Sequence, residues 1–417
     1  MRAMGVQGIQ INAVREQFPA LHRMSVDGQP AVFFDGPGGT QVPHSVIEAM
    51  VGYLSNSNSN IEGEFELTRK TDELIAKART YGGAFVGGSS DGITFGANMT
   101  SLNFNLSRAL GRTFKAGDEI ITTALDHDAN VAPWLLLAQD RGLVVRQVRL
   151  TEDLNLDLED LKAKLSEKTR VVAFCLASNA VGTLTPAAEI ARLAHEAGAL
   201  AWADAVAFAP HRRIDVESLG CDVVLCSPYK FFGPHLGMSW MRRDLAETLP
   251  AERVRPAGTE PPGHRFETGT LAHENIAGFV AAIDYLASLG AGDDLGGRLD
   301  GAFQAIQDRE AELAQRLVDE LDAVANVRVA GVREADPKKR VGTFGLVTPR
   351  HSPVLLARAL GEKGIYTWNG NFYAQGVVEH LGLDLDEGLL RLGLMHYNTV
   401  EEIERCGEQL RRLVGVA

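Results

Sequence analysis

The sequence predicts an α/β protein with a mostly parallel seven-stranded sheet and a smaller α+β domain after it. Seven short apolar runs alternate with helical patterns between residues 75 and 245. Apolar runs of this length are typical of parallel strands that are covered on both faces. Strand–helix alternation favours right-handed crossover connections, and these place neighbouring strands parallel. One long helical pattern, at 293–324, then separates this region from the last third of the chain.

Each element of this prediction has its own pattern. The seven apolar runs are 92–97, 119–125, 143–150, 170–178, 199–206, 222–227 and 237–243. A helix is predicted over 185–199, because Pro186 lies near its start and Gly198 near its end. Beyond the long helix, strands are predicted at 340–348, 364–368 and 389–397, and helices at 353–363 and 400–414.

These elements divide the chain into three expected parts. Residues 1–45 hold a short strand, a glycine-rich turn and the start of a helix, and we expect them to pack with the smaller domain. Residues 46–290 form the expected large, ligand-binding domain, and residues 291–417 the small C-terminal α+β domain.

Composition excludes several classes of partner. The net charge of −13 argues against nonspecific binding to nucleic acid and against an anionic membrane surface. The four cysteines form neither a CxxC pair nor a zinc spacing, so no disulfide framework and no metal site are expected. The first 21 residues lack the apolar core of a signal peptide, and no run is long enough to cross a membrane. We therefore expect a cytoplasmic protein.

Polar residues follow several of the predicted strands, where ligands of open α/β sheets bind. Asn98 and Thr100 follow the first run, and they suit a helix cap as well as a phosphate site. His127 and Asn179 follow two later runs, and each is also an ordinary loop residue. Taken singly, these residues do not decide between structure and function.

Asp204 and Lys230 are more informative. Asp204 ends an apolar run, and Lys230, the only lysine between Lys168 and Lys338, comes just after another. The two side chains could form a structural ion pair. A desolvated lysine could instead form a Schiff base with an aldehyde cofactor, while the aspartate holds the pyridine nitrogen of that cofactor.

The order of motifs along the chain resembles the class V aminotransferases, fold-type I pyridoxal-phosphate enzymes, and especially their cysteine desulfurase-like group. The matching segments are "DHDANVAPW" (126–134), Ser178-Asn179 to Gly182, "DAVAFAPH" (204–211), "SPYKFFGPHLGMSW" (227–240), "RFETGT" (265–270) and "RLGLMHYNT" (391–399). Each segment is a weak signal alone. Their common order covers nearly the whole chain and implies the fold-type I architecture.

The resemblance implies a role for each matching residue. Lys230 would carry pyridoxal 5'-phosphate as a Schiff base and move the substrate's α-proton, with Asp204 on the ring nitrogen and His127 on the ring face. The other expected cofactor contacts are Asn98, Met99, Asn179, Ser227, Tyr229 and Thr270. Thr270 would reach the phosphate of a partner subunit, which implies a homodimer with shared sites. The expected substrate contacts are Gly38, Gly39, Arg391 and Tyr373, with Arg391 clamping the carboxylate of an amino acid.

Three departures from the family pattern bear on the reaction. Tyr373 stands where cysteine desulfurases carry the loop cysteine that accepts sulfur, Ala207 replaces a glutamine or histidine, and Tyr229 replaces a histidine. We therefore expect C–S or C–Se bond cleavage by a lyase or desulfurase type of reaction that needs no loop cysteine. An aminotransferase or epimerase is the alternative, and a cofactor-binding pseudoenzyme is a third. A nicotinamide dehydrogenase is disfavoured because no G-x-G-x-x-G follows a first strand.

Overall fold

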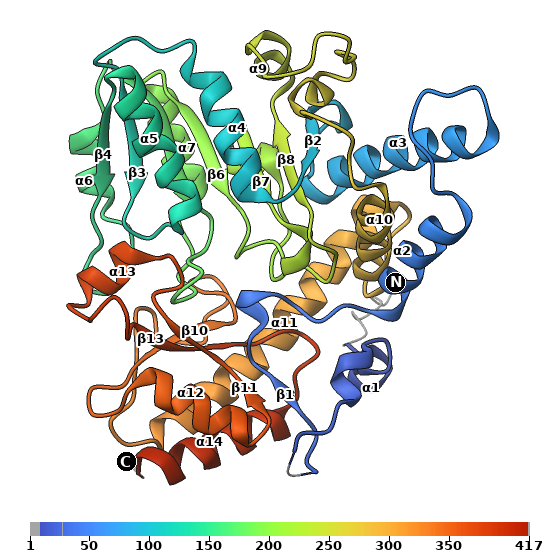
Figure 1. The fold of residues 1–417 in the computed structure, drawn as a ribbon. Helices are drawn as coiled ribbons and strands as arrows, with labels where there is room; N and C mark the ends of the chain where they lie inside the picture. The colour runs from blue at the N-terminus through green and yellow to red at the C-terminus, as the bar shows by residue number, and fades with distance from the viewer. Residues whose placement is uncertain (1–8, 27, 416–417) are drawn as a thin grey trace, which may run out of the picture.

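The structure is a computed structural model, and it describes residues 9–26 and 28–415. Residues 1–8 of the predicted N-terminal segment therefore lie outside the described residues. The prediction of an α/β fold is confirmed, because a seven-stranded sheet fills one half of the molecule and smaller sheets the other (Figure 1). No helix of the described part is long and apolar enough to cross a bilayer.

The large sheet contains all seven predicted strands. They are β2 (Ile93–Gly96), β3 (Glu119–Thr123), β4 (Val144–Val148), β5 (Thr169–Cys175), β6 (Leu200–Asp204), β7 (Val223–Cys226) and β8 (Gly237–Met241). Their spatial order is β2-β8-β7-β6-β5-β3-β4. Only β8 runs antiparallel to its neighbours. The loop from β7 to β8, residues 227–236, joins these two adjacent antiparallel strands at the carboxyl end of β7.

Helices cover both faces of this sheet. They are α2 (His44–Asn56), α3 (Glu66–Val86), α4 (Met99–Gly111), α5 (Ala132–Arg141), α6 (Leu158–Lys164), α7 (Ala187–Glu196), α8 (Val216–Leu219), α9 (Arg243–Thr248) and α10 (His273–Ser288). The central strands are buried on both faces, with side chains such as Phe174 and Trp202 fully enclosed, whereas the edge strand β4 is largely exposed. Helix α7 follows Pro186 and ends before Gly198, as its terminal signals predict.

The second half begins with the long helix α11 (Leu295–Asp322), which crosses from the large sheet to the smaller ones in Figure 1. A four-stranded antiparallel sheet contains β9 (Arg328–Val329), β10 (Thr343–Val347), β12 (Trp368–Gly370) and β13 (Leu389–Gly393), in the order β12-β13-β10-β9. The remaining elements are α1 (Ile11–Arg15), β1 (Val32–Phe33), β11 (Ile365–Tyr366), α12 (Pro353–Glu362), α13 (Gln375–His380) and α14 (Val400–Val414).

The strand predicted at 364–368 is divided in two. Its first part, β11, pairs in parallel with β1 near the N-terminus, and β12 pairs with β13 instead. The two parts pair with strands that are distant along the chain, β1 and β13. No local pattern in the sequence indicates this division.

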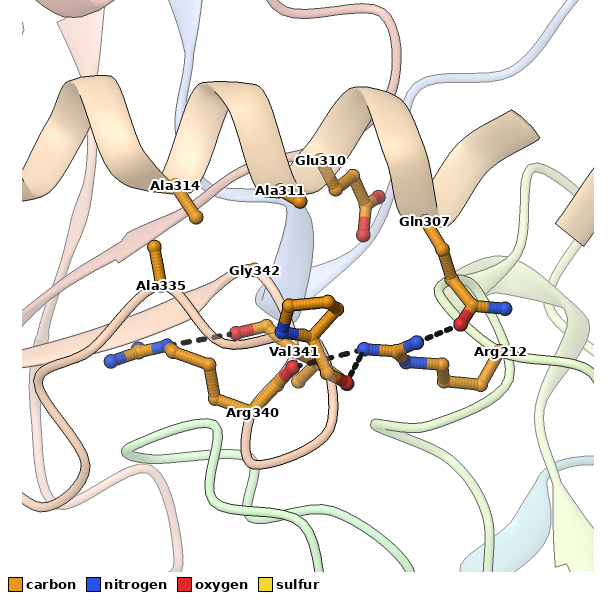
Figure 2. A pocket seen from close by; sticks show the side chains of 10 residues that line it. Arg212, Gln307, Glu310, Ala311, Ala314, Ala335, Arg340, Val341 and Gly342 are labelled. Carbon is orange, nitrogen blue, oxygen red and sulfur yellow. Dashed lines mark hydrogen bonds between the residues drawn. The ribbon is translucent and has the colours of Figure 1, made fainter. Parts of the chain in front are cut away.

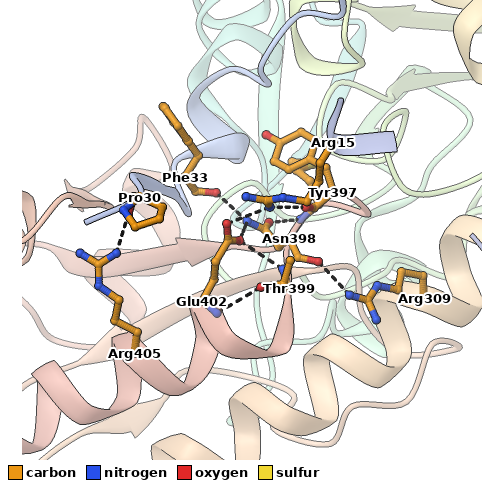
Figure 3. Close-up of polar contacts among 10 residues, drawn as sticks. Arg15, Pro30, Phe33, Arg309, Tyr397, Asn398, Thr399, Glu402 and Arg405 are labelled. Carbon is orange, nitrogen blue, oxygen red and sulfur yellow. Dashed lines mark hydrogen bonds and ion pairs between the residues drawn. The ribbon is translucent and has the colours of Figure 1, made fainter. Parts of the chain in front are cut away.

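Polar contacts fasten the N-terminal segment to the smaller half, as Figure 3 shows. Arg15 forms an ion pair of 2.8 Å with Glu402 of α14 and donates to the main-chain carbonyl of Tyr397. Asn398 donates to the carbonyl of Phe33 at the end of β1. The division of the chain at residues 45 and 290 into domains stays a prediction.

Arg212 joins the large sheet to the second half. It follows β6, and its guanidinium donates to the side chain of Gln307 on α11 and to the carbonyls of Pro337 and Arg340 (Figure 2). The cavity beside these groups encloses only about 10 Å³. That volume suits a single water molecule and not a substrate.

Candidate active site

The predicted site residues converge where the large sheet faces the smaller half. Asp204 is the last residue of β6, and Lys230 lies in the tight turn that follows the neighbouring strand β7. Because β6 and β7 are parallel, both residues emerge at the same edge of the sheet. The loops 36–39 and 371–373 and strand β13 approach this edge from the other half, as the contacts below show.

The amine of Lys230 is held between the two halves of the molecule. Its Nζ donates to the carbonyl of Pro37 and lies 4.9 Å from the ring centre of Tyr229. Burial, with the positive charge of Arg391, lowers the pKa of Lys230 to about 7, although Asp204 opposes this change. A large share of the amine is therefore neutral, and nucleophilic, near neutral pH.

Asp204 is a buried carboxylate. Its Oδ1 accepts a hydrogen bond of 2.8 Å from the main-chain N–H of Val206. Burial raises the pKa of Asp204 to about 6, and the Val206 N–H and the charge of Lys230 partly offset that rise. A carboxylate in this setting gains from a cationic N–H partner.

His127 is held as a neutral ring. Its Nδ1 accepts a hydrogen bond of 3.0 Å from the N–H of Ala129, which leaves Nε2 to carry the proton. Burial first, and then the charges of Lys230 and Arg391, lower the pKa of His127 to about 4. The imidazole can therefore stack on an aromatic ring without adding a charge.

A buried polar network supports the turn that carries His127. Asp126 accepts from Asn130 at 2.8 Å, Asn103 donates to Asn130 at 3.1 Å, and Trp202 donates to Asn103 at 2.9 Å. The network joins α4, the turn and strand β6. No local sequence pattern indicates this network, because Asn103 and Trp202 are distant from the turn along the chain.

Arg391 lies on β13, is buried, and presents one edge to the site. Its Nη1 donates to the carbonyl of Asn179 at 2.8 Å, while its Nε is buried without a hydrogen-bond partner. The ring of Phe372 covers one face of the guanidinium, 4.0 Å from its central carbon. Burial lowers the pKa of Arg391 to about 9, and Asp35 and Tyr229 oppose this change. The Nε edge can hold a carboxylate in the plane of the guanidinium.

Three predicted phosphate contacts meet at the start of α4. Asn98 caps this 13-residue helix by accepting from the N–H of Ser101 at 2.8 Å. The N–H of Met99 donates to the hydroxyl of Ser227 at 3.0 Å. Gly237 lies so close that a Cβ atom there would collide with the backbone of Asn98. A helix N-terminus with these neighbours suits an anionic group.

The remaining predicted residues lie around this centre at different distances. Asn179 donates to the carbonyl of Phe372 at 2.8 Å and keeps a buried Oδ1 without a partner. The ring of Tyr229 stacks on His235, with centroids 4.9 Å apart, and a Cβ on Gly39 would lie 3.5 Å from Tyr229. Thr270 is exposed and borders a pocket of about 900 Å³ that Ser101 also lines.

Gly38 and Tyr373 are the remaining predicted substrate contacts. A Cβ on Gly38 would collide with the indole nitrogen of Trp368, and the ring of Tyr373 lies 5.3 Å from that of His127. Trp368, Phe372 and Asp35 were not predicted as site residues. Asp35 had a usable signal, since it directly precedes the glycine-rich turn 36–39.

The residues present fit pyridoxal phosphate. They offer a partly neutral lysine, a buried carboxylate, a neutral imidazole and a helix N-terminus. The Oδ1 of Asn179 and the Nε of Arg391 are buried without a partner, so both can form a further hydrogen bond to a bound molecule. The described residues contain no group of three histidine, cysteine, aspartate or glutamate side chains that could hold a metal ion.

Comparison with known proteins shows the family of the chain. The family model "Aminotransferase class-V" matches residues 32–406. A cysteine desulfurase of Synechococcus elongatus is 31% identical over 98% of this chain, and the chain covers 64% of that relative. A probable cysteine desulfurase of Synechocystis is also 31% identical, over 96% of this chain and 95% of the relative.

Solved structures share the fold. A cysteine desulfurase from Thermococcus onnurineus matches 99% of both chains with a TM-score of 0.85 at 26% identity. A cysteine desulfurase from Escherichia coli matches 98% of this chain and 100% of its own, with a TM-score of 0.83 at 22% identity. The chain therefore belongs to the class V aminotransferases and is a pyridoxal-phosphate-dependent enzyme related to cysteine desulfurases.

Proposed function

We propose that the enzyme is a lyase that cleaves the C–S or C–Se bond of an amino acid and uses no cysteine of its own as sulfur acceptor. The observation that carries the proposal is that the thiol groups are buried and neutral. All four cysteines, Cys175, Cys221, Cys226 and Cys406, are buried. Burial raises the pKa of Cys221 and of Cys406 to about 12, and it raises those of Cys175 and Cys226 as well. A buried neutral thiol is a poor nucleophile toward sulfur.

The residues of the site support an amino acid substrate. The open Nε edge of Arg391 suits the α-carboxylate, and the neutral fraction of the Lys230 amine can accept the α-proton. Asp204 would hold the cofactor's ring nitrogen protonated, and His127 would cover the ring. The cofactor supplies an electron sink for the pair left by the α-proton. The leaving group can then depart as a free thiol or selenol.

The cofactor contacts are part of this proposal. Asn98, Met99, Ser227 and Tyr229 would hold the phosphate with Thr270 of a second copy, and Asn179 would meet the ring's phenolic oxygen through its second amide hydrogen. Such an assembly is a homodimer with shared sites. The cytoplasmic location also stays a prediction.

The test is incubation of the purified enzyme with cysteine, cystine or selenocysteine and no keto acid. We expect pyruvate together with sulfide, persulfide or selenide in the medium, and no persulfide on the protein by mass spectrometry. Lys230→Ala should abolish both turnover and the visible absorbance of the bound cofactor. A persulfide on Cys175, Cys221, Cys226 or Cys406, or an absence of pyruvate, would contradict the lyase.

An epimerase or aminotransferase is the second candidate. Tyr373 favours an epimerase, because its ring lies 5.3 Å from His127 and its hydroxyl could act as a second acid opposite Lys230. Incubation in D₂O separates the candidates. An epimerase incorporates deuterium at Cα and inverts it without forming pyruvate, and an aminotransferase requires a keto acid to recover its cofactor absorbance.

A further inference from the structure

Large aromatic side chains surround the substrate side of the site. Trp368 on β12 is the direct cross-strand partner of Arg391 on β13, so the two side chains share one face of the sheet. The indole also packs against the backbone of Gly38, beside the carbonyl that receives the Lys230 amine. Even so, 49% of Trp368 is exposed. An exposed indole beside a carboxylate-binding arginine offers apolar surface to whatever that arginine binds.

Phe372 and Tyr373 extend this aromatic surface. Trp368, Phe372 and Tyr373 together are called the aromatic wall. Phe372 lies on the guanidinium of Arg391, and Tyr373, which is 67% exposed, faces His127. The ring of Tyr229 lies 4.9 Å from the Lys230 amine. The three groups that would touch the reacting amino acid, Lys230, His127 and Arg391, are therefore each in contact with an aromatic ring.

The wall is held in place rather than free to move aside. Phe372 and Tyr373 both have left-handed backbone angles, with φ of 55° and 57°. This conformation is costly for residues with a side chain, so other contacts must maintain it. The Phe372 carbonyl accepts from Asn179 at 2.8 Å, and the Tyr373 carbonyl accepts from the N–H of Asp128 at 2.7 Å. These bonds fix the turn to the loops of the large sheet.

Arg391 is the arginine that acts on the titratable groups of the site. Among the described residues, Arg391 is the one arginine whose charge lowers the pKa of both Lys230 and His127. If Arg391 holds the α-carboxylate, the aromatic rings of Trp368 and Tyr373 offer no positive charge to a negatively charged substrate side chain. Desolvation of such a charge without a partner is unfavourable.

We propose that the site selects an amino acid whose β-thio (or seleno) substituent is uncharged and aromatic or similarly bulky and apolar, and that Trp368 and Tyr373 determine this preference. The thio part of the proposal rests on the proposed lyase function. In the net reaction the Cα–H and Cβ–S bonds break, and the sulfur leaves with the C–S electron pair and takes up a proton. One water then converts the remaining three-carbon unit to pyruvate and ammonia.

The test measures binding and turnover separately on the holoenzyme. S-benzyl-L-cysteine, S-methyl-L-cysteine and S-carboxymethyl-L-cysteine are titrated while the cofactor absorbance reports binding, and pyruvate reports turnover. We expect S-benzyl-L-cysteine to bind at least tenfold more tightly than S-carboxymethyl-L-cysteine, since tenfold corresponds to about 1.4 kcal/mol. This preference appears in the dissociation constant even if no pyruvate forms, so failure of the lyase and failure of the selectivity are distinguishable.

Variants of Trp368 test whether the aromatic wall causes the preference for S-benzyl-L-cysteine. Trp368→Ala should weaken the binding of S-benzyl-L-cysteine on the order of tenfold and leave that of S-methyl-L-cysteine within about twofold, while Trp368→Phe retains most of the preference. Leu355→Ala on α12, another exposed apolar residue, is the control and should change neither constant. Equal binding of the benzyl and carboxymethyl compounds would overturn the proposal. So would a Trp368→Ala enzyme with unchanged binding but an altered oligomeric mass, because the indole would then serve contact between copies.

Discussion

Burial prepares the chemistry of the site residue by residue. Lys230 lies among Pro37, Tyr229 and Arg391. The Pro37 carbonyl and the Tyr229 ring do not fully compensate the charged amine for its lost hydration. The ammonium is therefore disfavoured, and the amine becomes reactive at a pH where surface lysines are fully charged. Asp204 and His127 are shifted in the same way, toward their neutral forms.

The pH dependence of cofactor uptake follows from the Lys230 pKa of about 7. Only the neutral amine attacks the aldehyde, so the rate at which apoenzyme takes up pyridoxal phosphate should rise with pH and reach half its maximum near pH 7. An ordinary lysine would reach that point near pH 10.5. Stopped-flow absorbance at a series of pH values measures this rate. A rate that keeps rising tenfold per pH unit above pH 9 would contradict the lowered pKa.

Individual site residues were predictable from the sequence where a strand presents them. Asp204 and Lys230 end or follow buried apolar strands, so their position at the sheet edge can be inferred from local pattern. Phe372 and Trp368 reach the site only because β12 pairs with β13. Nothing near them in the sequence indicates that pairing, and they resemble ordinary loop and strand aromatics.

Elements were predictable to the extent that their pattern is local. Six of the seven strands of the large sheet, the long helix α11 and helix α14 lie within the predicted ranges, and β5 begins one residue before its range. The division of 364–368 into β11 and β12 was not predicted, because each part depends on a distant partner. Strand β12 pairs with β13, 19 to 23 residues later, and β11 pairs with β1 near the other end of the chain. Long-range pairing overrides local β preference in such cases.

Helix α14 has a start that can be tested. Thr399 accepts from the N–H of Glu402 at 3.3 Å, and Glu402 accepts from the N–H of Thr399 at 3.1 Å, which forms a capping box. Thr399→Ala should lower the free energy of unfolding by about 1 kcal/mol, because two helix-terminal groups lose or weaken a partner. Denaturant unfolding measures this change. Thr399→Ser keeps the hydroxyl and should stay within about 0.5 kcal/mol of the parent; an equal loss in both variants would argue against the cap.

At the scale of the whole molecule, the site depends on both halves being fixed to each other. Arg391 donates across to Asn179, Asp128 donates to Tyr373, and Lys230 donates to Pro37. Arg212 also links the large sheet to α11 through its hydrogen bond to Gln307. The proposed cofactor contacts therefore come from the large sheet and the proposed substrate contacts largely from the smaller half, so we expect relative movement of the halves to change the substrate site first.

One face of the molecule suggests that the chain does not act alone. Helix α2 packs on α10, yet Ile47, Val51 and Leu54 on it are 42%, 56% and 53% exposed. Their spacing of four and three residues places them on one stripe of the helix. An uncovered apolar stripe is typical of a protein interface, and it agrees with the proposed homodimer.

The oligomeric state tests this interface directly. Sedimentation of the holoenzyme should give twice the 45.0 kDa of the chain. Val51→Glu places a charge in the stripe, so we expect it to shift the equilibrium toward single chains and to lower activity in proportion, because Thr270 would no longer reach a second site. Leu355→Glu, at an exposed position on α12 outside the stripe, should leave both mass and activity unchanged. A parent enzyme that sediments as one chain with full activity would show that each site is complete within one copy.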